Sequence, residues 1–321
     1  MKRFIAFLTA AAAAISMTSC MKKDVEVEHK VSQPPKLVFM GDSIAAGYGL
    51  EGYTSTDNYN CQSYSNILKD KYTDALKDSC GHEMLNVAVS GDTSAELLEH
   101  IDNGEFDKDL KGSDAVVISI GGNDILEIFT EFLSENFDSD TGIMGLFSAI
   151  DSIGSIGDDV DAALDNFEPN LKQIVMDIRK RTNGEIFIQT LYNPLEYFDK
   201  LSFLVDFSNE KIGKLNDIIK ENSETNGIPQ YTVIDVAPTF KGKCGELTTI
   251  KNFDIHPNAE GHKVIADVVD ESLQSKKYSY TVIEKQTDVK AVVMLTVACC
   301  AAAAVIITTS VVIYKKRKSR K

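Results

Sequence analysis

Five short apolar segments, separated by longer segments of helical periodicity, constrain the fold more than any other feature of this sequence. Each apolar segment is four to six residues long, rich in β-branched residues and bounded by Gly, Asp or Asn. They occupy residues 37–40, 85–89, 115–120, 185–189 and 231–234. Apolar residues recur at helical spacing at about 62–77, 93–102, 168–182, 206–223 and 258–274. This alternation predicts an α/β fold with a doubly wound, mostly parallel sheet of five strands.

The interval 125–167 interrupts the alternation, because its apolar groups are separated by acidic or Gly-rich stretches. It fits either an ordinary outer helix or a mobile cover over a site. The residues that would form such a cover are Phe129, Phe132, Leu133, Met144, Leu146 and Phe147.

The stretch from Asp138 to Gly142 resembles a calcium loop but lacks a glutamate at the twelfth position, so no metal site is predicted. Gly47-Tyr48-Gly49 lacks the third glycine of a dinucleotide-binding loop, and no nucleotide cofactor is predicted.

The N-terminus has the three parts of an export signal. The first three residues carry two positive charges, residues 4–17 are uncharged and mostly apolar, and two small residues precede Cys20. We therefore expect a signal peptide over residues 1–19 and a linker over 20–35. Residues 17–20 also resemble a bacterial lipobox, so Cys20 is either a site of lipid attachment or a coincidental cysteine after an ordinary signal.

An uncharged segment of 24 residues, 291–314, lies close to the C-terminus. A helix of this length measures about 36 Å, which is enough to cross a hydrocarbon core of about 30 Å. Six basic residues follow within 315–321, matching the excess of positive charge on the cytoplasmic side of membrane helices. We expect a single-pass anchor in the cell membrane with a basic cytoplasmic tail, a polar stalk over 276–290, and an extracellular domain over 36–275.

Charge restricts the partners of the exported part. Two basic residues leave with the signal and seven flank the anchor, so this part keeps 24 of the 33 Lys and Arg against all 48 Asp and Glu, a net charge of −24. Such a surface repels phosphate backbones and anionic head groups. Nucleic acid is therefore not expected as a partner, no protein partner is indicated, and the expected membrane contact is the C-terminal helix.

Three cysteines, Cys61, Cys80 and Cys244, allow at most one disulfide in this part.

Four polar clusters occur near the predicted carboxyl ends of strands or before the last helix, and open α/β sheets bind their ligands at that edge. They are Gly41-Asp42-Ser43, Ser90-Gly91-Asp92, Gly121-Gly122-Asn123-Asp124 and Asp254-Ile255-His256-Pro257. In order and position they resemble the four blocks of the SGNH, or GDSL, esterase and lipase family over roughly residues 36–275. The resemblance implies a flavodoxin-like SGNH hydrolase fold and metal-independent hydrolysis of carboxylic esters without a cofactor.

The residue types themselves suit acyl transfer. The hydroxyl of Ser43, at a strand-to-helix turn, needs a base to take its proton, and His256 is the natural base. Asp254 can hold the imidazole in the correct tautomer. The commoner pattern of the family places two residues between the acid and the histidine, whereas Ile255 alone separates them here. A backbone carbonyl and Asp235, at the end of the last strand, are therefore alternatives to Asp254.

Acyl transfer also places negative charge on the carbonyl oxygen of the substrate, which needs hydrogen-bond donors already aimed at it. The expected donors of this oxyanion hole, which the family resemblance also implies, are the backbone N–H groups of Ser43 and Gly91 and the side-chain amide of Asn123. Each residue has a structural alternative: a helix cap for Ser43, a turn glycine for Gly91 and a turn residue for Asn123.

His262, on the last predicted helix of the domain, is expected to be solvated.

These features together predict a membrane-anchored, extracellular serine esterase that works through an acyl-enzyme. A lipase or lysophospholipase acting on acyl chains and a carbohydrate deacetylase acting on an acetylated glycan both fit, because the sequence does not fix the length of the acyl group. An alternative from another class is a surface-anchored binding module that has kept the fold without the chemistry. The presence of Ser43, Gly91, Asn123 and His256 argues against that alternative.

Overall fold

The computed structural model describes residues 22–125, 128 and 153–320 of the 321-residue chain. Outside the described residues lie the predicted signal peptide, Cys20, the predicted cover residues from Phe129 to Phe147 and the stretch from Asp138 to Gly142. The described chain forms two units. Residues 30–279 make up the larger unit, and residues 22–29 with 280–320 make up the smaller one.

The larger unit is built on a sheet of five parallel strands in the order β3-β2-β4-β5-β8. The strands are β2 (Lys36–Gly41), β3 (Glu83–Asn86), β4 (Ala115–Ser119), β5 (Glu185–Gln189) and β8 (Thr232–Ile234). The register places Val38 of β2 beside Leu85 of β3 on one side and Val116 of β4 on the other. Four strands lie within one residue of the predicted segments, β3 begins two residues and ends three residues earlier than predicted, and the predicted parallel sheet is confirmed.

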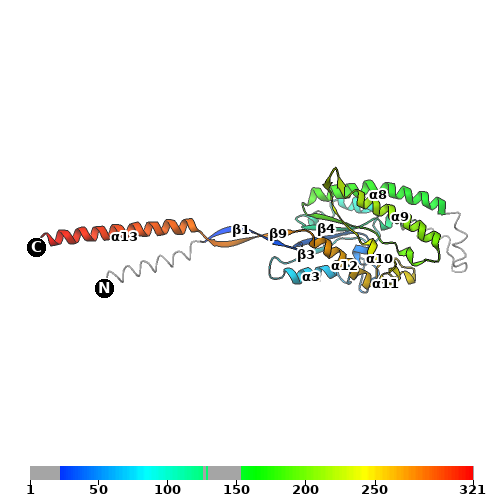
Figure 1. Ribbon diagram of the computed structural model, residues 1–321, viewed down its shortest axis with the longest axis horizontal. Coiled ribbons are helices and arrows are strands. Elements are labelled where there is room, and N and C mark those ends of the chain that lie inside the picture. The colour runs from blue at the N-terminus through cyan, green and yellow to red at the C-terminus, as the bar shows by residue number, and fades with distance from the viewer. Residues whose placement is uncertain (1–21, 126–127, 129–152, 321) are drawn as a thin grey trace. The chain divides into compact units, whose positions relative to one another are not determined.

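Helices lie on both sides of this sheet, with α8 and α9 on one side and α3 and α12 on the other (Figure 1). The longer helices are α3 (Tyr64–Leu76), α4 (Ser94–Asp102), α8 (Ile153–Arg181), α9 (Ser202–Glu221) and α12 (Ala259–Gln274). The short helices are α2 (Ser43–Ala46), α5 (Asp107–Leu110), η2 (Pro194–Tyr197), α10 (Ala237–Phe240), α11 (Cys244–Leu247) and η3 (Ile250–Asn252), and a hairpin of β6 (Glu224–Thr225) and β7 (Ile228–Pro229) follows α9. Because both faces are covered, residues 37–40 and 115–118 have no solvent exposure.

Helix α8 begins earlier than predicted. The expected start lay near residue 168, whereas the helix begins at Ile153. Its buried side chains Val160, Leu164 and Phe167 recur every three or four residues, and this apolar stripe continues past Pro169. A proline usually marks the first turn of a helix, and here the buried stripe outweighs that signal.

The strand order creates a topological switch point between β2 and β4. The chain leaves β2 for β3 on one side and then returns to β4 on the other. Open α/β sheets bind ligands at such a point, beyond the carboxyl ends of the strands. Ser43 and Asn123 follow β2 and β4 within four residues, so the fold brings them to this point.

His262 on α12 is fully buried, which corrects the expectation that it is solvated. Its ring stacks on that of Tyr64 with the centroids 6.0 Å apart, and its Nδ1 accepts a hydrogen bond from the backbone N–H of Tyr64 at 3.2 Å. Burial lowers the pKa of His262 to about 3, so the ring is neutral near neutral pH. The residue therefore joins α12 to α3 inside the core. Cys61, Cys80 and Cys244 of the same unit are free thiols.

Much of the smaller unit belongs to a two-stranded sheet of β1 (Lys22–Val31) and β9 (Tyr278–Thr287). The sequence analysis predicts a linker over 20–35 and a polar stalk over 276–290 here, without a strand in either. On β1 the half-buried residues Val25, Val27 and His29 alternate with exposed charged residues. The ring of His29 stacks on Tyr280, and its Nε2 lies 3.2 Å from the carboxylate of Glu284. The two-residue period was present in the sequence, but the charged neighbours concealed it.

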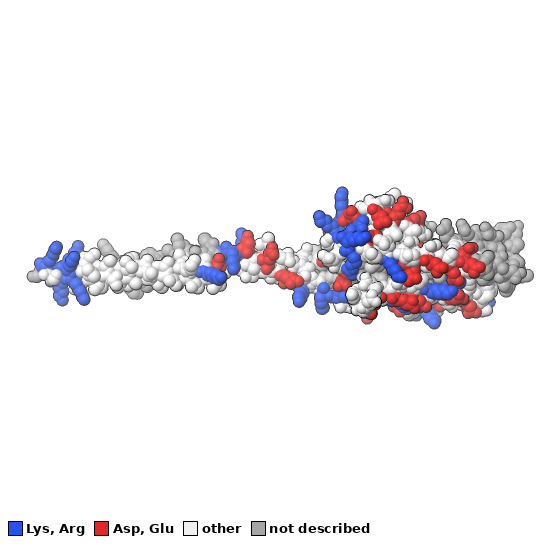
Figure 2. All heavy atoms as spheres, turned by 90° about the horizontal axis from the view of Figure 1, so that it is seen from above, with Lys and Arg blue, Asp and Glu red and all other residues white. Residues whose placement is uncertain are grey.

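The smaller unit also contains helix α13 (Val289–Lys318), which covers the predicted anchor. The helix is long and apolar enough to cross a membrane, by length and composition. Figure 2 shows Lys and Arg side chains gathered at its end, beyond an uncharged stretch.

Candidate active site

Ser43 is held at the carboxyl end of β2 by a tight turn. Gly41 has a φ of 115°, and a Cβ atom there would lie 1.8 Å from the backbone oxygen of Ser119 on β4, so only glycine fits. The carboxylate of Asp42 caps α2 by accepting a hydrogen bond from the backbone N–H of Ile44 at 3.0 Å. The same carboxylate accepts a hydrogen bond from the hydroxyl of Ser119 on β4, also at 3.0 Å. Burial raises the pKa of Asp42 to about 7. Ser43 is thereby fixed as the first residue of α2.

The imidazole of His256 connects Ser43 to Asp254. Its Nε2 atom lies 2.9 Å from Oγ of Ser43, and its Nδ1 atom lies 2.6 Å from Oδ1 of Asp254. When Nδ1 carries the proton and donates to the carboxylate, Nε2 is left to accept a hydrogen bond from the serine hydroxyl. The three side chains therefore have the geometry of a nucleophile, a general base and an orienting acid in series.

The short spacing between Asp254 and His256 is accommodated by an Asx turn. Oδ1 of Asp254 accepts a hydrogen bond from the backbone N–H of His256 at 3.0 Å, in addition to its contact with the ring. The hydroxyl of Tyr192 donates to the carbonyl of Ile255 at 2.8 Å and anchors the loop. Partial burial raises the pKa of Asp254, but the hydrogen bonds from the backbone and ring of His256 outweigh it and hold the pKa below its ordinary value.

Asp235, the alternative acid, is engaged elsewhere. Its Oδ1 accepts a hydrogen bond from the Thr190 hydroxyl at 2.9 Å, and its Oδ2 lies 3.2 Å from Nζ of Lys220. The geometry favours Asp254 as the partner of the histidine.

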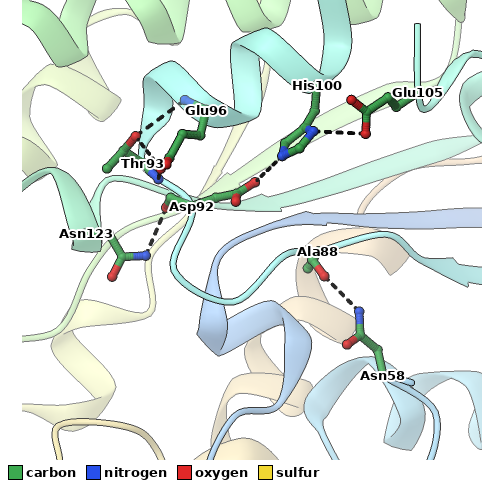
Figure 3. Close-up of polar contacts among 8 residues, drawn as sticks. All are labelled: Asn58, Ala88, Asp92, Thr93, Glu96, His100, Glu105 and Asn123. Carbon is green, nitrogen blue, oxygen red and sulfur yellow. Dashed lines mark hydrogen bonds and ion pairs between the residues drawn. The ribbon is translucent and has the colours of Figure 1, made fainter. Parts of the chain in front are cut away.

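The loops that follow β3 and β4 bring Gly91 and Asn123 to the same cavity as Ser43. The side-chain amide of Asn123 donates to the backbone carbonyl of Asp92 at 2.9 Å (Figure 3). An amide carries two N–H groups, so this bond orients the side chain and leaves one N–H for a ligand. Ser94 links the two loops again, because its backbone N–H donates to the carboxylate of Asp124 at 2.9 Å.

Sequence reasoning missed the polar contacts that brace the loop after β3. The buried carboxylate of Asp92 lies 3.7 Å from Nε2 of His100, whose Nδ1 lies 2.9 Å from Glu105 (Figure 3). Burial raises the pKa of Asp92 to about 6. Thr93 and Glu96 form a capping box at the start of α4. A Thr followed three residues later by a Glu is a helix-start signal, and it places His100 two turns along the same helix.

Asparagine side chains brace this region from the other side. The amide of Asn58 donates to the carbonyl of Ala88 at 2.8 Å (Figure 3), and the amide of Asn66 donates to the carbonyl of Asn58 at the same distance. The amide of Asn86 donates to the carbonyl of Ala45 in α2 at 2.8 Å. These bonds connect the helix that carries Ser43 to the loop that carries Gly91, and none of them was expected from the sequence.

The predicted site residues share one cavity of about 870 Å³. All five of them line it: Ser43, Gly91, Asn123, Asp254 and His256. Within residues 22–125, 128 and 153–320, no group of three or more His, Cys, Asp or Glu side chains is arranged to hold a metal ion.

The parallel sheet and its flanking helices match the fold of SGNH hydrolases. The chain belongs to the GDSL-like lipase/acylhydrolase family, which it matches over residues 39–264. The resemblance inferred from the four sequence blocks is therefore confirmed.

Several known proteins are similar to the chain. The uncharacterized protein YpmR of Bacillus subtilis (strain 168) is 22% identical over 268 residues, covering 81% of this chain and 89% of YpmR. The lipase Lip_vut3 from a goat rumen metagenome is 19% identical, with a TM-score of 0.55 over 74% of this chain and 96% of its own. An extracellular lipase from Streptomyces rimosus is 18% identical, with a TM-score of 0.54 over 74% and 98%. A catalytic mutant of Axe2, an acetylxylan esterase from Geobacillus stearothermophilus, is 17% identical, with a TM-score of 0.50 over 76% and 96%. At these identities the structural likeness shows a shared fold.

Proposed function

We propose that the protein hydrolyses carboxylic esters with Ser43 as the nucleophile, His256 as the general base and Asp254 as the orienting acid. The observation that carries this proposal is the pair of contacts made by His256, 2.9 Å to Ser43 and 2.6 Å to Asp254. They occur in the cavity that Gly91 and Asn123 also line. A nucleophile, a base and oxyanion donors in one cavity are the minimum that acyl transfer requires.

In the first half-reaction, Oγ of Ser43 attacks the ester carbonyl carbon while its proton moves to Nε2 of His256. Asp254 remains ionised because its pKa is held low, and its carboxylate stabilises the imidazolium that forms. The backbone N–H groups of Ser43 and Gly91 and the amide of Asn123 donate to the carbonyl oxygen as it becomes negative. The C–O bond of the ester then breaks, His256 returns the proton to the departing alcohol, and an acyl group stays on Ser43.

In the second half-reaction, a water molecule attacks the acyl carbon and gives its proton to Nε2 of His256. The bond to Oγ of Ser43 breaks, the histidine returns the proton to the serine, and the carboxylic acid leaves. One ester and one water become one acid and one alcohol, so no cofactor or metal is required.

Two substrate classes fit the proposed reaction. Proteins that share the fold include two lipases and an acetylxylan esterase. A lipase or lysophospholipase that releases an acyl chain and a carbohydrate deacetylase are therefore both consistent with the family.

The proposed location is the outer face of the cell membrane. The first 19 residues act as an export signal, α13 crosses the membrane once, and the basic residues at its C-terminal end remain in the cytoplasm. The catalytic domain is then extracellular, and Cys20 is a site at which a lipid could be attached.

Hydrolysis of p-nitrophenyl esters from acetyl to palmitoyl tests the proposed reaction. The full chain should release p-nitrophenol, and Ser43→Ala and His256→Ala should each abolish turnover while the protein remains folded. A parent protein that hydrolyses none of these esters would favour a binding module on the same fold.

A further inference from the structure

We infer that Tyr48 and Phe253 form the subsite for the alcohol part of the ester, and that this alcohol is the neutral sugar ring of a glycan. The assignment rests on the proposed function, because it takes Ser43 as the nucleophile and His256 as the base. It names the substrate class and the two side chains that select it.

The direction of the reaction places the alcohol next to these two aromatic rings. The departing alcohol oxygen must lie near Nε2 of His256, which protonates it, while the carbonyl oxygen points toward Gly91 and Asn123. The ring of Tyr48 packs against the ring of His256 with the centroids 4.5 Å apart. Phe253 belongs to the same loop as the histidine, and both aromatic residues line the cavity. They therefore lie on the side where the alcohol leaves.

Phe253 has a solvent exposure and a backbone conformation that the packing of the fold does not require. Its side chain is 79% exposed, more than any other large apolar residue in the described part of residues 30–279. Its backbone has a φ of 60°, a left-handed conformation that Gly and Asn adopt at lower cost than Phe. An aromatic residue at a strained and solvated position beside an active site indicates a role in binding.

Neighbouring aromatic residues hold both rings in place. The ring of Phe253 stacks on that of Phe198, with the centroids 6.0 Å apart and 21° between the planes, and Phe198 packs against the core. The ring of Tyr48 contacts that of Tyr53 at 5.5 Å. A pyranose ring has an apolar C–H face that stacks on flat aromatic surfaces, while its hydroxyl groups remain at the edge. Two supported rings provide such surfaces without first having to become ordered.

The charge of the cavity disfavours a lysophospholipid as the substrate. Glu96 and Asp254 line it, both with a pKa held below the ordinary value by hydrogen bonds, and none of its described lining residues is Lys or Arg. The alcohol part of a lysophospholipid carries a phosphate, which would lie among these carboxylates without a counter-charge. A neutral sugar meets no such repulsion.

Three acetyl esters that differ only in their alcohol test the assignment. They are a fully acetylated glucose, ethyl acetate and the acetyl ester of glycerol 3-phosphate. We expect the full chain to show the highest kcat/KM on the acetylated sugar and the lowest on the phosphate-bearing ester. The acyl group is the same in all three, but the alcohols differ as leaving groups, so each kcat/KM is divided by the rate constant for hydroxide hydrolysis of the same ester. The corrected values are the ones compared, and their differences report on the alcohol subsite.

Variants of Phe253 separate ring stacking from loop geometry. Phe253→Asn and Phe253→Gly keep the left-handed turn, so their thermal midpoints should not fall below that of the parent. Each should lower kcat/KM on the acetylated sugar about tenfold and on ethyl acetate less than about twofold. Phe253→Tyr should retain the preference for the sugar. Asn226, the other non-glycine residue with a positive φ among those described, is the matched control, and Asn226→Gly should change none of these values.

The outcomes distinguish this assignment from the proposed function. A parent protein that hydrolyses none of the three esters would contradict the proposed function itself. Similar kcat/KM values on all three esters would leave the esterase in place and overturn the sugar subsite. An equal loss on the sugar and on ethyl acetate in Phe253→Asn would also overturn it, because Phe253 would then serve to position the Asp254 loop.

Discussion

The Nε2 atom of His256 lies 2.9 Å from the Oγ atom of Ser43, although 213 positions separate the two residues in the chain. The short helix α2 fixes the serine just after β2, and the loop before α12 fixes the histidine. The contact therefore depends on the whole sheet, since β2 lies near its middle and α12 follows the last strand.

The orienting acid can be tested against its matched alternative. Asp254→Asn should lower kcat by about 10⁴-fold, compared with about 10⁶-fold for Ser43→Ala, because an acid contributes less than the nucleophile in such a triad. Asp235→Asn should change kcat by less than about twofold, since that carboxylate pairs with Lys220 and Thr190. Steady-state kinetics on p-nitrophenyl acetate measures both, and a silent Asp254→Asn with a severe Asp235→Asn would reverse the assignment.

The amide of Asn123 is expected to act mainly in the transition state. Asn123→Ala should reduce kcat by about 10²–10³-fold with little change in KM, because the developing oxyanion loses one donor. Asn222→Ala removes an amide that binds the carbonyl of Ile218 at the end of α9, and it serves as the control with unchanged kinetics. A raised KM with normal kcat in Asn123→Ala would mean that the amide only binds substrate.

Most of the sheet could be predicted because its inner strands β2, β4 and β5 are buried on both faces. The segments that became β2 and β4 are continuous apolar runs, and that signal needs no knowledge of tertiary contacts. The start of α8 could not be predicted, because Pro169 is typical of the first turn of a helix. Only the packing of the preceding turns shows that the helix begins at Ile153 and continues past Pro169. The strand β1 was missed because its partner β9 lies about 250 residues away, and its charged residues hide its period.

For the candidate site, the sequence predicted the roles of Ser43, His256 and Asp254 but left Asp235 and a backbone carbonyl as alternatives to the acid. Ser43, Gly91 and Asn123 were selected from blocks at the ends of strands and His256 from the block before the last helix, and the structure brings them to one cavity. The buried contact between Asp92 and His100 could not be foreseen, since it depends on how the loop after β3 meets α4. His262 was placed on the surface because a polar residue on an amphipathic helix usually faces water.

The buried ring of His262 predicts a specific loss of stability in acid. Its pKa is about 3 in the folded protein and near 6.5 in an unfolded chain, so its contribution is complete above pH 6.5 and is lost as the pH falls toward 3. His262→Asn keeps an acceptor for the Tyr64 N–H and removes the titration. Between pH 6 and 4 the free energy of unfolding of the parent should therefore fall more steeply than that of the variant, by roughly 1.4 kcal/mol per pH unit.

Urea titrations of the full chain in detergent measure this difference. The chain contains no Trp, so near-ultraviolet circular dichroism of its tyrosines follows the unfolding of the core. Parallel pH profiles for the parent and His262→Asn would contradict this prediction, because they would show that the pKa of His262 is the same in the folded and the unfolded protein.

Removal of residues 290–321 in a variant that also carries Cys20→Ala, so that no lipid holds the N-terminus, should release a soluble enzyme with unchanged kcat, because all the predicted site residues precede the removed segment. Protease added to intact cells should likewise shed activity into the medium. Activity that stays protected until the cells are broken would contradict the extracellular orientation.

The central claim, that Ser43 is an activated nucleophile, is tested most directly by labelling the full chain with a serine-directed fluorophosphonate and locating the adduct by mass spectrometry. We predict a single adduct on Ser43 in the parent, none in Ser43→Ala, and much slower labelling in His256→Ala because the base is missing. A parent protein that stays unlabelled and also leaves p-nitrophenyl acetate intact, or one that is labelled on a different serine, would contradict the account.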